Sequence, residues 1–113
     1  MIKIYHNPRC RKSREGLQLL EKSGKEFEIV KYLENVPTEE ELNIIIKKLD
    51  IVPIQLVRKT EKIWKEEYKS KDLTDKEIVT AMITNPKLIE RPIVINNKQA
   101  VIGRPPEKIS NII

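Results

Sequence analysis

Two strand-like segments on either side of an amphipathic segment limit the fold of this chain more than any other feature of its sequence. Residues 2–5 alternate apolar and polar side chains, which predicts a strand. Residues 11–23 predict a helix that ends at Gly24, a residue common just after the last helical turn. Residues 27–32 predict a second strand. A strand, a helix and a strand of these lengths predict a parallel, right-handed βαβ unit.

The middle of the chain has the pattern of helices rather than strands. Two Thr-x-x-Glu patterns, at residues 38–41 and 74–77, are typical of helix N-termini. A proline that opens residues 53–58 predicts a short helix between them. Apolar residues follow the two Thr-x-x-Glu patterns at helical spacing, namely Leu42, Ile45, Ile46 and Leu49 after the first and Ile78, Ala81 and Met82 after the second.

The C-terminal part returns to strands. Residues 93–95 and 100–102 predict a hairpin around a turn at residues 96–98, and Gly103 ends it. A last helix is expected from Pro105 onward. The order βαβ, helices, ββα predicts an α/β fold with a mixed sheet and a helical insertion between the second and third strands.

The length of the chain suits one domain with one hydrophobic core. We expect that domain to cover residues 1–113, with the helical insertion at about residues 37–87. No apolar run approaches the roughly 20 residues that span a bilayer, so no membrane partner is expected. The N-terminal apolar run is too short for a secretory signal, and a cytoplasmic location is the expectation.

The chain has one cysteine, Cys10, and one histidine, His6. An internal disulfide is therefore impossible, and a conventional zinc site is excluded. The formal net charge of +5 suits an anionic substrate or a nucleic acid. Aromatic residues are only 4% of the chain, which argues against stacking platforms for single-stranded nucleic acid.

Cys10 lies where the first predicted strand gives way to the first predicted helix. The free N–H groups of a helix N-terminus favour an anion, and cationic side chains adjoin Cys10 in the sequence: Arg9, Arg11, Lys12 and Arg14. Both features lower the pKa of a thiol and favour the nucleophilic thiolate. The alternative is a buried, inert cysteine that acts as a small apolar residue. The polar and basic neighbours favour a partly exposed, reactive Cys10.

Ser13 occupies the position at which thioredoxin-type oxidoreductases carry a second cysteine. A serine cannot resolve a mixed disulfide, so monothiol chemistry with an external thiol is expected. His6, Asn7 and Ser13 are candidate supporting residues, which could orient the loop or donate hydrogen bonds to the thiolate or to an anion. The alternative is that each only satisfies its own turn or the first turn of the helix.

Five segments follow one another from end to end of the chain: residues 6–14, 32–37, 56–59, 91–94 and 103–107. In these segments, and in their order, the chain resembles the ArsC-type, glutaredoxin-linked arsenate reductases. Membership of this family implies a thioredoxin-like fold. It also implies reduction of arsenate, or a similar oxyanion, with glutathione as co-substrate, glutaredoxin as partner and no bound metal or organic cofactor.

The resemblance also implies roles for single residues. Cys10 matches the nucleophile that attacks arsenic. Arg58, Arg91 and Arg104 match three arginines that hold the oxyanion. Arginine suits this role because its planar fork of donors pairs with two oxyanion oxygens at once. Pro92 matches the cis-proline that precedes the third strand of thioredoxin folds and faces the reactive cysteine.

Arg11 and Lys12 depart from the family, whose well-characterised members often have small residues after the cysteine. For this reason another oxyanion, or a mixed disulfide, is an alternative substrate. A transcription regulator of the Spx type, which binds RNA polymerase, is an alternative of another class. Ser13 and Arg104 favour the enzyme, because Spx-type proteins usually carry a Cys-x-x-Cys switch and lack the Gly-Arg-Pro-Pro-Glu segment. No motif supports a nucleic-acid-binding domain.

Overall fold

The computed structural model describes every residue of the chain, Met1–Ile113. Its contacts divide the chain into two units. The first consists of Met1–Asn35 with Arg91–Ile113, and the second is Val36–Glu90. The helical insertion predicted at residues 37–87 lies inside the second unit. That the chain forms one domain stays a prediction.

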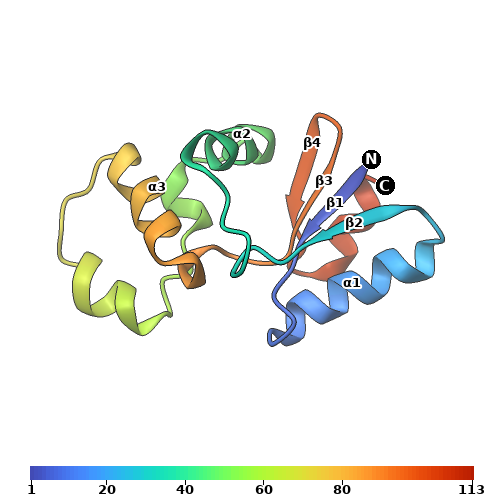
Figure 1. Ribbon diagram of the computed structural model, residues 1–113, viewed down its shortest axis with the longest axis horizontal. Coiled ribbons are helices and arrows are strands. Elements are labelled where there is room, and N and C mark those ends of the chain that lie inside the picture. Colours follow the sequence, from blue (N-terminus) through green and yellow to red (C-terminus); the bar gives the residue numbers. More distant parts are fainter. The chain divides into compact units, whose positions relative to one another are not determined.

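The first unit contains a four-stranded mixed sheet in the order β2-β1-β3-β4 (Figure 1). Strand β1 pairs in parallel with β2 and antiparallel with β3, and β3 pairs antiparallel with β4. The strands are β1 (Ile2–Tyr5), β2 (Phe27–Val30), β3 (Ile93–Asn96) and β4 (Gln99–Ile102). The predicted βαβ unit, hairpin and mixed sheet are confirmed.

The helix α1 (Arg11–Ser23) connects β1 and β2 and packs with the C-terminal 3₁₀ helix η4 (Pro106–Asn111). Gly24 ends α1 in the left-handed conformation, with φ of 73°, which costs glycine little because it has no Cβ. The sequence predicts a helix here, but it does not predict that this helix is a 3₁₀ helix. Its bonds join residues three apart, as from the Lys108 N–H to the Pro105 carbonyl at 3.1 Å and from the Ile112 N–H to the Ile109 carbonyl at 3.2 Å.

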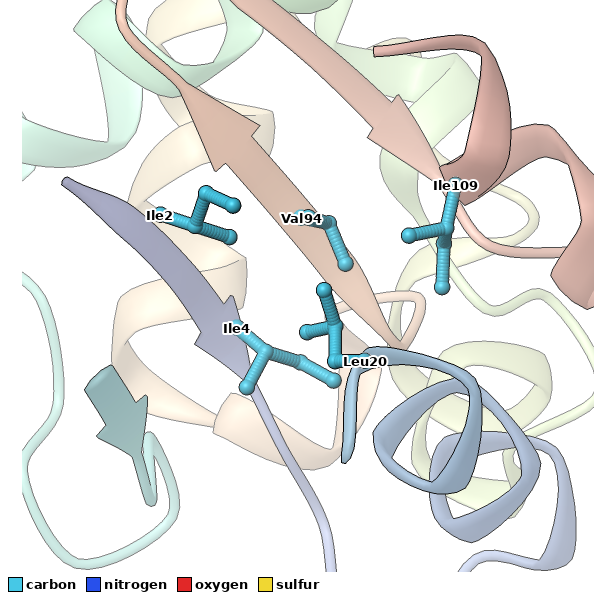
Figure 2. Packing of buried hydrophobic residues seen from close by; sticks show 5 residues of the cluster. All are labelled: Ile2, Ile4, Leu20, Val94 and Ile109. Atoms are coloured by element: carbon cyan, nitrogen blue, oxygen red, sulfur yellow. The ribbon is translucent and has the colours of Figure 1, made fainter. Parts of the chain in front are cut away.

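One face of the sheet forms the core of the first unit (Figure 2). The side chains of Ile2 and Ile4 alternate with Lys3 along β1, so both point to this face. There they meet Val94 of β3, Leu20 of α1 and Ile109 of η4, and all five are buried. Full burial of an aliphatic side chain contributes about 1.5–3 kcal/mol, so this cluster fixes α1, and the loop before it, against β1.

The second unit is helical. Helices α2 (Glu39–Leu49) and α3 (Asp75–Thr84) begin at the two predicted capping boxes. Thr38 and Thr74 each accept a backbone hydrogen bond from the glutamate three residues on, at 3.1 and 3.2 Å. A short antiparallel bridge joins Val57 to Ile89, so the segment that contains α3 starts and ends at neighbouring positions.

Several short elements differ from the expectation. The helix predicted over residues 53–58 is a 3₁₀ helix over Pro53–Leu56, and a second 3₁₀ helix, Pro86–Leu88, follows α3. A π-helix at Trp64–Tyr68 was not predicted. It has the wide i to i+5 bond, from the Lys69 N–H to the Trp64 carbonyl at 2.8 Å, and the two rings at its ends stack with centroids 5.6 Å apart.

Strand β2 is two residues shorter than predicted. It ends at Val30 because the chain turns at once, with the amides of Glu34 and Asn35 donating to the carbonyl of Lys31. The hairpin loop is Asn97 and Lys98, and Asn97 has a φ of 57°, which asparagine tolerates better than most residues. None of the helices is long and apolar enough to cross a membrane.

Candidate functional site

Cys10 is the N-cap residue of α1, at the end of the loop that leaves β1. Its thiol is partly exposed. The loop ends in a turn, in which the Cys10 N–H donates to the Asn7 carbonyl at 3.0 Å, and the first bond of the helix then runs from the Arg14 N–H to the Cys10 carbonyl at 3.0 Å. The sulfur therefore lies beside the free N–H groups of the first helical turn.

The pKa of the Cys10 thiol is lowered below its usual value of 9.0. Burial acts in the opposite direction and raises the pKa, but it is outweighed by groups that stabilise the thiolate. These are a hydrogen bond from the Ser13 N–H, a hydrogen bond and the charge of the Arg91 guanidinium, and a hydrogen bond from the Lys12 N–H. The largest lowering effects thus come from the helix N-terminus and from Arg91. The contribution of the helix agrees with the prediction, whereas the cationic side chains beside Cys10 in the sequence, which were also predicted to lower the pKa, are not among these groups.

Arg91 and Arg104 lie close to the thiol although both are more than 80 residues away in the sequence. Nη2 of Arg104 lies 3.4 Å from the Cys10 Sγ, and its Nε donates to the Arg91 carbonyl at 2.7 Å. Arg91 is buried. The strand β3 follows Arg91 and the strand β4 precedes Arg104, so the hairpin brings both guanidinium groups to the end of the sheet where α1 begins.

The ring of Pro92 lies beside two glycines. A Cβ added to Gly16 would lie 2.8 Å from the Pro92 Cγ, and one added to Gly103 would lie 3.0 Å from the same atom. Each would also meet the Cδ1 of Ile109, at 3.1 and 2.9 Å. The Arg91–Pro92 peptide bond is cis, the isomer that the family resemblance implied, and the Arg104–Pro105 bond is also cis. These glycines leave the space in which Pro92 sits next to Arg91.

His6, Asn7 and Ser13 form one buried network under the loop. The Ser13 Oγ lies 2.6 Å from Nδ1 of His6 and accepts from the Asn7 N–H at 2.9 Å. The Asn7 Oδ1 accepts from the Arg9 N–H at 3.0 Å and closes the turn. The pKa of His6 is lowered, first by burial and then by the charges of Lys31 and Arg14. A neutral imidazole is therefore favoured beneath the thiol loop.

Arg58 belongs to the second unit, whereas Cys10, Arg91 and Arg104 belong to the first. Within the second unit its Nε lies 3.4 Å from a carboxylate oxygen of Glu61, and its Nη1 lies 3.2 Å from one of Glu90. The structure thus brings two of the three predicted arginines to the thiol. That Arg58 joins them stays a prediction.

Sequence reasoning missed Gly16 and Gly103 as residues of this site. A signal existed for Gly16, because a glycine inside a helix costs about 1 kcal/mol relative to alanine and often has a packing reason. Glu90 as a partner of Arg58 gave no signal, since it becomes a neighbour only through the bridge between Val57 and Ile89.

The first unit therefore combines a stabilised thiolate with two guanidinium groups at one place. Such an arrangement can hold an anion against a sulfur nucleophile. The chain has no group of three or more His, Cys, Asp or Glu side chains placed to hold a metal ion.

Comparison with known proteins gives matches over nearly the whole chain. The family model described as the ArsC family matches residues 5–112. An arsenate reductase of Haemophilus influenzae is 44% identical over 97% of both chains. A protein of Escherichia coli K12, called uncharacterized protein YfgD, is 45% identical over 99% of this chain and 96% of its own. A solved structure described as an arsenate reductase from Vibrio cholerae is 44% identical, with a TM-score of 0.94 and coverage of 99% of this chain and 97% of that one. These matches confirm the thioredoxin-like fold expected from the resemblance.

Proposed function

Because this chain belongs to the ArsC family, we propose that it reduces arsenate, with the Cys10 thiolate as nucleophile. The observation that carries the proposal is the meeting of Arg91 and Arg104 at the Cys10 thiol, whose pKa is lowered. A reactive thiolate needs a substrate with an electrophilic centre, and two guanidinium groups favour an oxyanion around that centre. Arsenate, an anion with an electrophilic arsenic, has both properties.

The two arginines have separable tasks in this proposal. Arg91 stabilises the thiolate before the substrate arrives and then pairs with an arsenate oxygen. Arg104 is oriented by the Arg91 carbonyl, at 2.7 Å, so that its outer nitrogens reach both the sulfur and a bound oxyanion. As negative charge moves from sulfur to the arsenate oxygens in the transition state, donors already in place stabilise it without reorganisation.

The proposed cycle uses two external thiols, because the chain has no second cysteine. The Cys10 thiolate attacks arsenic(V), and one oxygen leaves as water after protonation. Glutathione replaces a second oxygen, again as water, and forms a second S–As bond. The thiol of glutaredoxin then attacks the glutathione sulfur, and the electron pair of the broken S–As bond reduces arsenic(V) to arsenic(III). Water hydrolyses the remaining S–As bond, which releases arsenite and the Cys10 thiol.

The buried network is proposed to hold the thiol loop in position during this cycle. Ser13 acts through its N–H, which lowers the pKa of Cys10, and through its hydroxyl, which ties His6 to the Asn7 backbone. Pro92 acts by fixing the position of Arg91. Arg58 is proposed as a third oxyanion ligand, and it would have to exchange a carboxylate partner for arsenate to act.

The test is arsenate reduction by the purified protein with glutathione and glutaredoxin. We expect turnover by the wild type and none by Cys10→Ser. A matched control combines Cys10→Ser with Ser23→Cys, which restores one thiol at the far end of α1, where Ser23 is exposed. This control is expected to stay inactive.

Absence of turnover by wild-type protein with a titrated free thiol would exclude arsenate as the substrate. The same thiol would then be tested against other oxyanions and against glutathione mixed disulfides. Binding to the C-terminal domain of the RNA polymerase α-subunit would be measured for the regulator alternative.

A further inference from the structure

A cavity of about 310 Å³ lies beside the thiol loop, entirely within the first unit. One wall is the loop itself, residues 6–9, and the other is formed by Lys31, Leu33 and Glu34 just after β2. Its volume is at the lower end of the range for small-molecule sites. It is therefore large enough for part of a small ligand and too small for a folded partner.

The charges around this cavity form an uneven set. Arg9 and Lys31 provide two cationic groups, and Glu34 provides one carboxylate. None of the three takes part in an ion pair within the chain. A small molecule with two carboxylates and one ammonium group has the complementary charges.

We propose that this cavity binds the charged end of the small thiol co-substrate, a peptide thiol with two carboxylates and one ammonium group, while its sulfur displaces an oxygen, as water, from the arsenic bound to Cys10. The inference rests on the proposed function, because it names the place of the external thiol in that cycle. Arg9 and Lys31 pair with carboxylates, and Leu33 packs against the methylene groups of the ligand.

The cavity is within reach of the reactive sulfur. Pro8, in the cavity wall, is two residues from Cys10, and two residues of fully extended chain span at most about 7 Å. The hydrogen bond from Cys10 to the Asn7 carbonyl shortens this path. A tripeptide spans roughly 10 Å, so one ligand can place its thiol at Cys10 and a carboxylate between Arg9 and Lys31.

The wall next to the thiol is held in position without a ligand. The Asn7 side chain fixes the Arg9 amide at 3.0 Å, and Nη1 of Arg14 donates to the Pro8 carbonyl at 3.0 Å. A site that is formed in advance loses little conformational entropy on binding. This supports a ligand site rather than a gap between mobile loops.

His6 provides a built-in reporter of the cavity, because it lines the cavity and is the only histidine of the chain. Its pKa is lowered by burial and by the charges of Lys31 and Arg14, while Ser13 and Glu21 act in the opposite direction. Anion binding between Lys31 and Arg9 would offset the cationic field and favour the imidazolium. The ring resonance of His6 should therefore respond to an anionic ligand through its pKa as well as directly.

The experiment titrates full-length protein with S-methylglutathione, which has no free thiol, and follows the His6 ring C–H resonance by NMR. We expect a saturable shift and a raised pKa of His6. Arg9→Gln and Lys31→Gln should each weaken binding about three- to tenfold, the range of a partly exposed charge-assisted contact. Lys22→Gln, which removes an exposed cation from the last turn of α1, should bind as the wild type does.

Three results would each overturn the inference. They are an unchanged His6 resonance at 10 mM ligand, equal binding of the diester of the same ligand, which lacks both carboxylate charges, and wild-type affinity in both cavity variants. The same samples are used to measure whether arsenate protects Cys10 from an alkylating reagent. Arsenate protection without a His6 response would remove only the cavity site, and a His6 response without arsenate protection would remove the proposed substrate and leave the cavity site.

Discussion

The two units of the molecule hold their candidate arginines in different ways. In the first unit Arg104 contacts the Cys10 sulfur and the Arg91 carbonyl, at 3.4 and 2.7 Å. In the second unit Arg58 lies between the carboxylates of Glu61 and Glu90, at 3.4 and 3.2 Å. The contacts of Arg104 place a guanidinium nitrogen beside the reactive sulfur, whereas Arg58 pairs with two carboxylates, one of which an oxyanion would have to displace. The matched arginines Arg104 and Arg58 are therefore not equivalent.

The largest effect is expected for Arg91→Ala. Arg91 lowers the pKa of Cys10 by a hydrogen bond and by its charge, and in our proposal it also binds the oxyanion. Loss of one preorganised donor costs roughly 10²–10³ in rate, so kcat/KM for arsenate should fall by about that factor. The pH midpoint of Cys10 alkylation should rise in the same variant.

Arg91→Lys separates the two tasks, because a lysine keeps the charge and loses the planar fork. It should retain most of the lowered alkylation midpoint and still lose arsenate turnover. An alkylation midpoint unchanged in Arg91→Ala would show that Arg91 does not stabilise the thiolate.

Gly16→Ala should destabilise the first unit by about 1–3 kcal/mol, the usual cost of an extra methyl in a packed site. The new Cβ would lie 2.8 Å from the Pro92 Cγ and 3.1 Å from the Ile109 Cδ1. Urea unfolding gives the free energy of unfolding. Because Pro92 is bonded to Arg91, we also expect a raised alkylation midpoint for Cys10.

Gly24→Ala is the matched control for this prediction. Its added Cβ has no atom within 4 Å, and only the positive φ of 73° opposes it, which costs about 1 kcal/mol. It should lower the stability and leave the Cys10 midpoint unchanged. Equal midpoints in the two glycine variants would contradict the role of Gly16 as a positioning residue.

The two units also differ in how far their structure follows from the sequence. The capping boxes and the apolar stripe of α2 are local, so the second unit's main helices could be predicted from neighbouring residues. The contact between Cys10 and Arg104 joins residues 94 positions apart, and only the family resemblance indicated it. The π-helix at Trp64–Tyr68 was missed because its i to i+5 bond has no distinct sequence pattern. Of the two carboxylate partners of Arg58, Glu61 is a local neighbour three residues on, whereas Glu90 depends on the tertiary bridge at Val57, which no local pattern indicates.

Arg58→Ala should have a smaller effect than Arg91→Ala, about a tenfold loss in kcat/KM. The reason is that its gain from binding arsenate is offset by the loss of a carboxylate contact. Glu90→Gln should act in the opposite direction and lower the KM for arsenate about two- to threefold, since it removes one competing charge. Steady-state kinetics on stably folded variants measure both effects. If both variants retain wild-type KM and kcat, Arg58 takes no part in oxyanion binding and the match to the family's third arginine has no function here.

The smallest effect concerns His6 and the pH dependence of stability. The folded pKa of His6 lies below its usual value of 6.5, first because of burial and then because of Lys31 and Arg14. As the pH falls below about 6.5, the unfolded chain takes up a proton before the folded chain does, so the free energy of unfolding decreases. Above that pH the contribution of the neutral His6 to the free energy of unfolding is fully present and constant.

Urea unfolding at several pH values between 7 and 5 should show this decrease in the wild type. His6→Gln should show a shallower decrease over the same range, because it has no imidazole to protonate and the carboxylates are the same in both proteins. Parallel pH profiles for the two proteins would mean that the network of His6, Ser13 and Asn7 accommodates an imidazolium as well as a neutral ring, and that the thiol loop does not depend on the charge of His6.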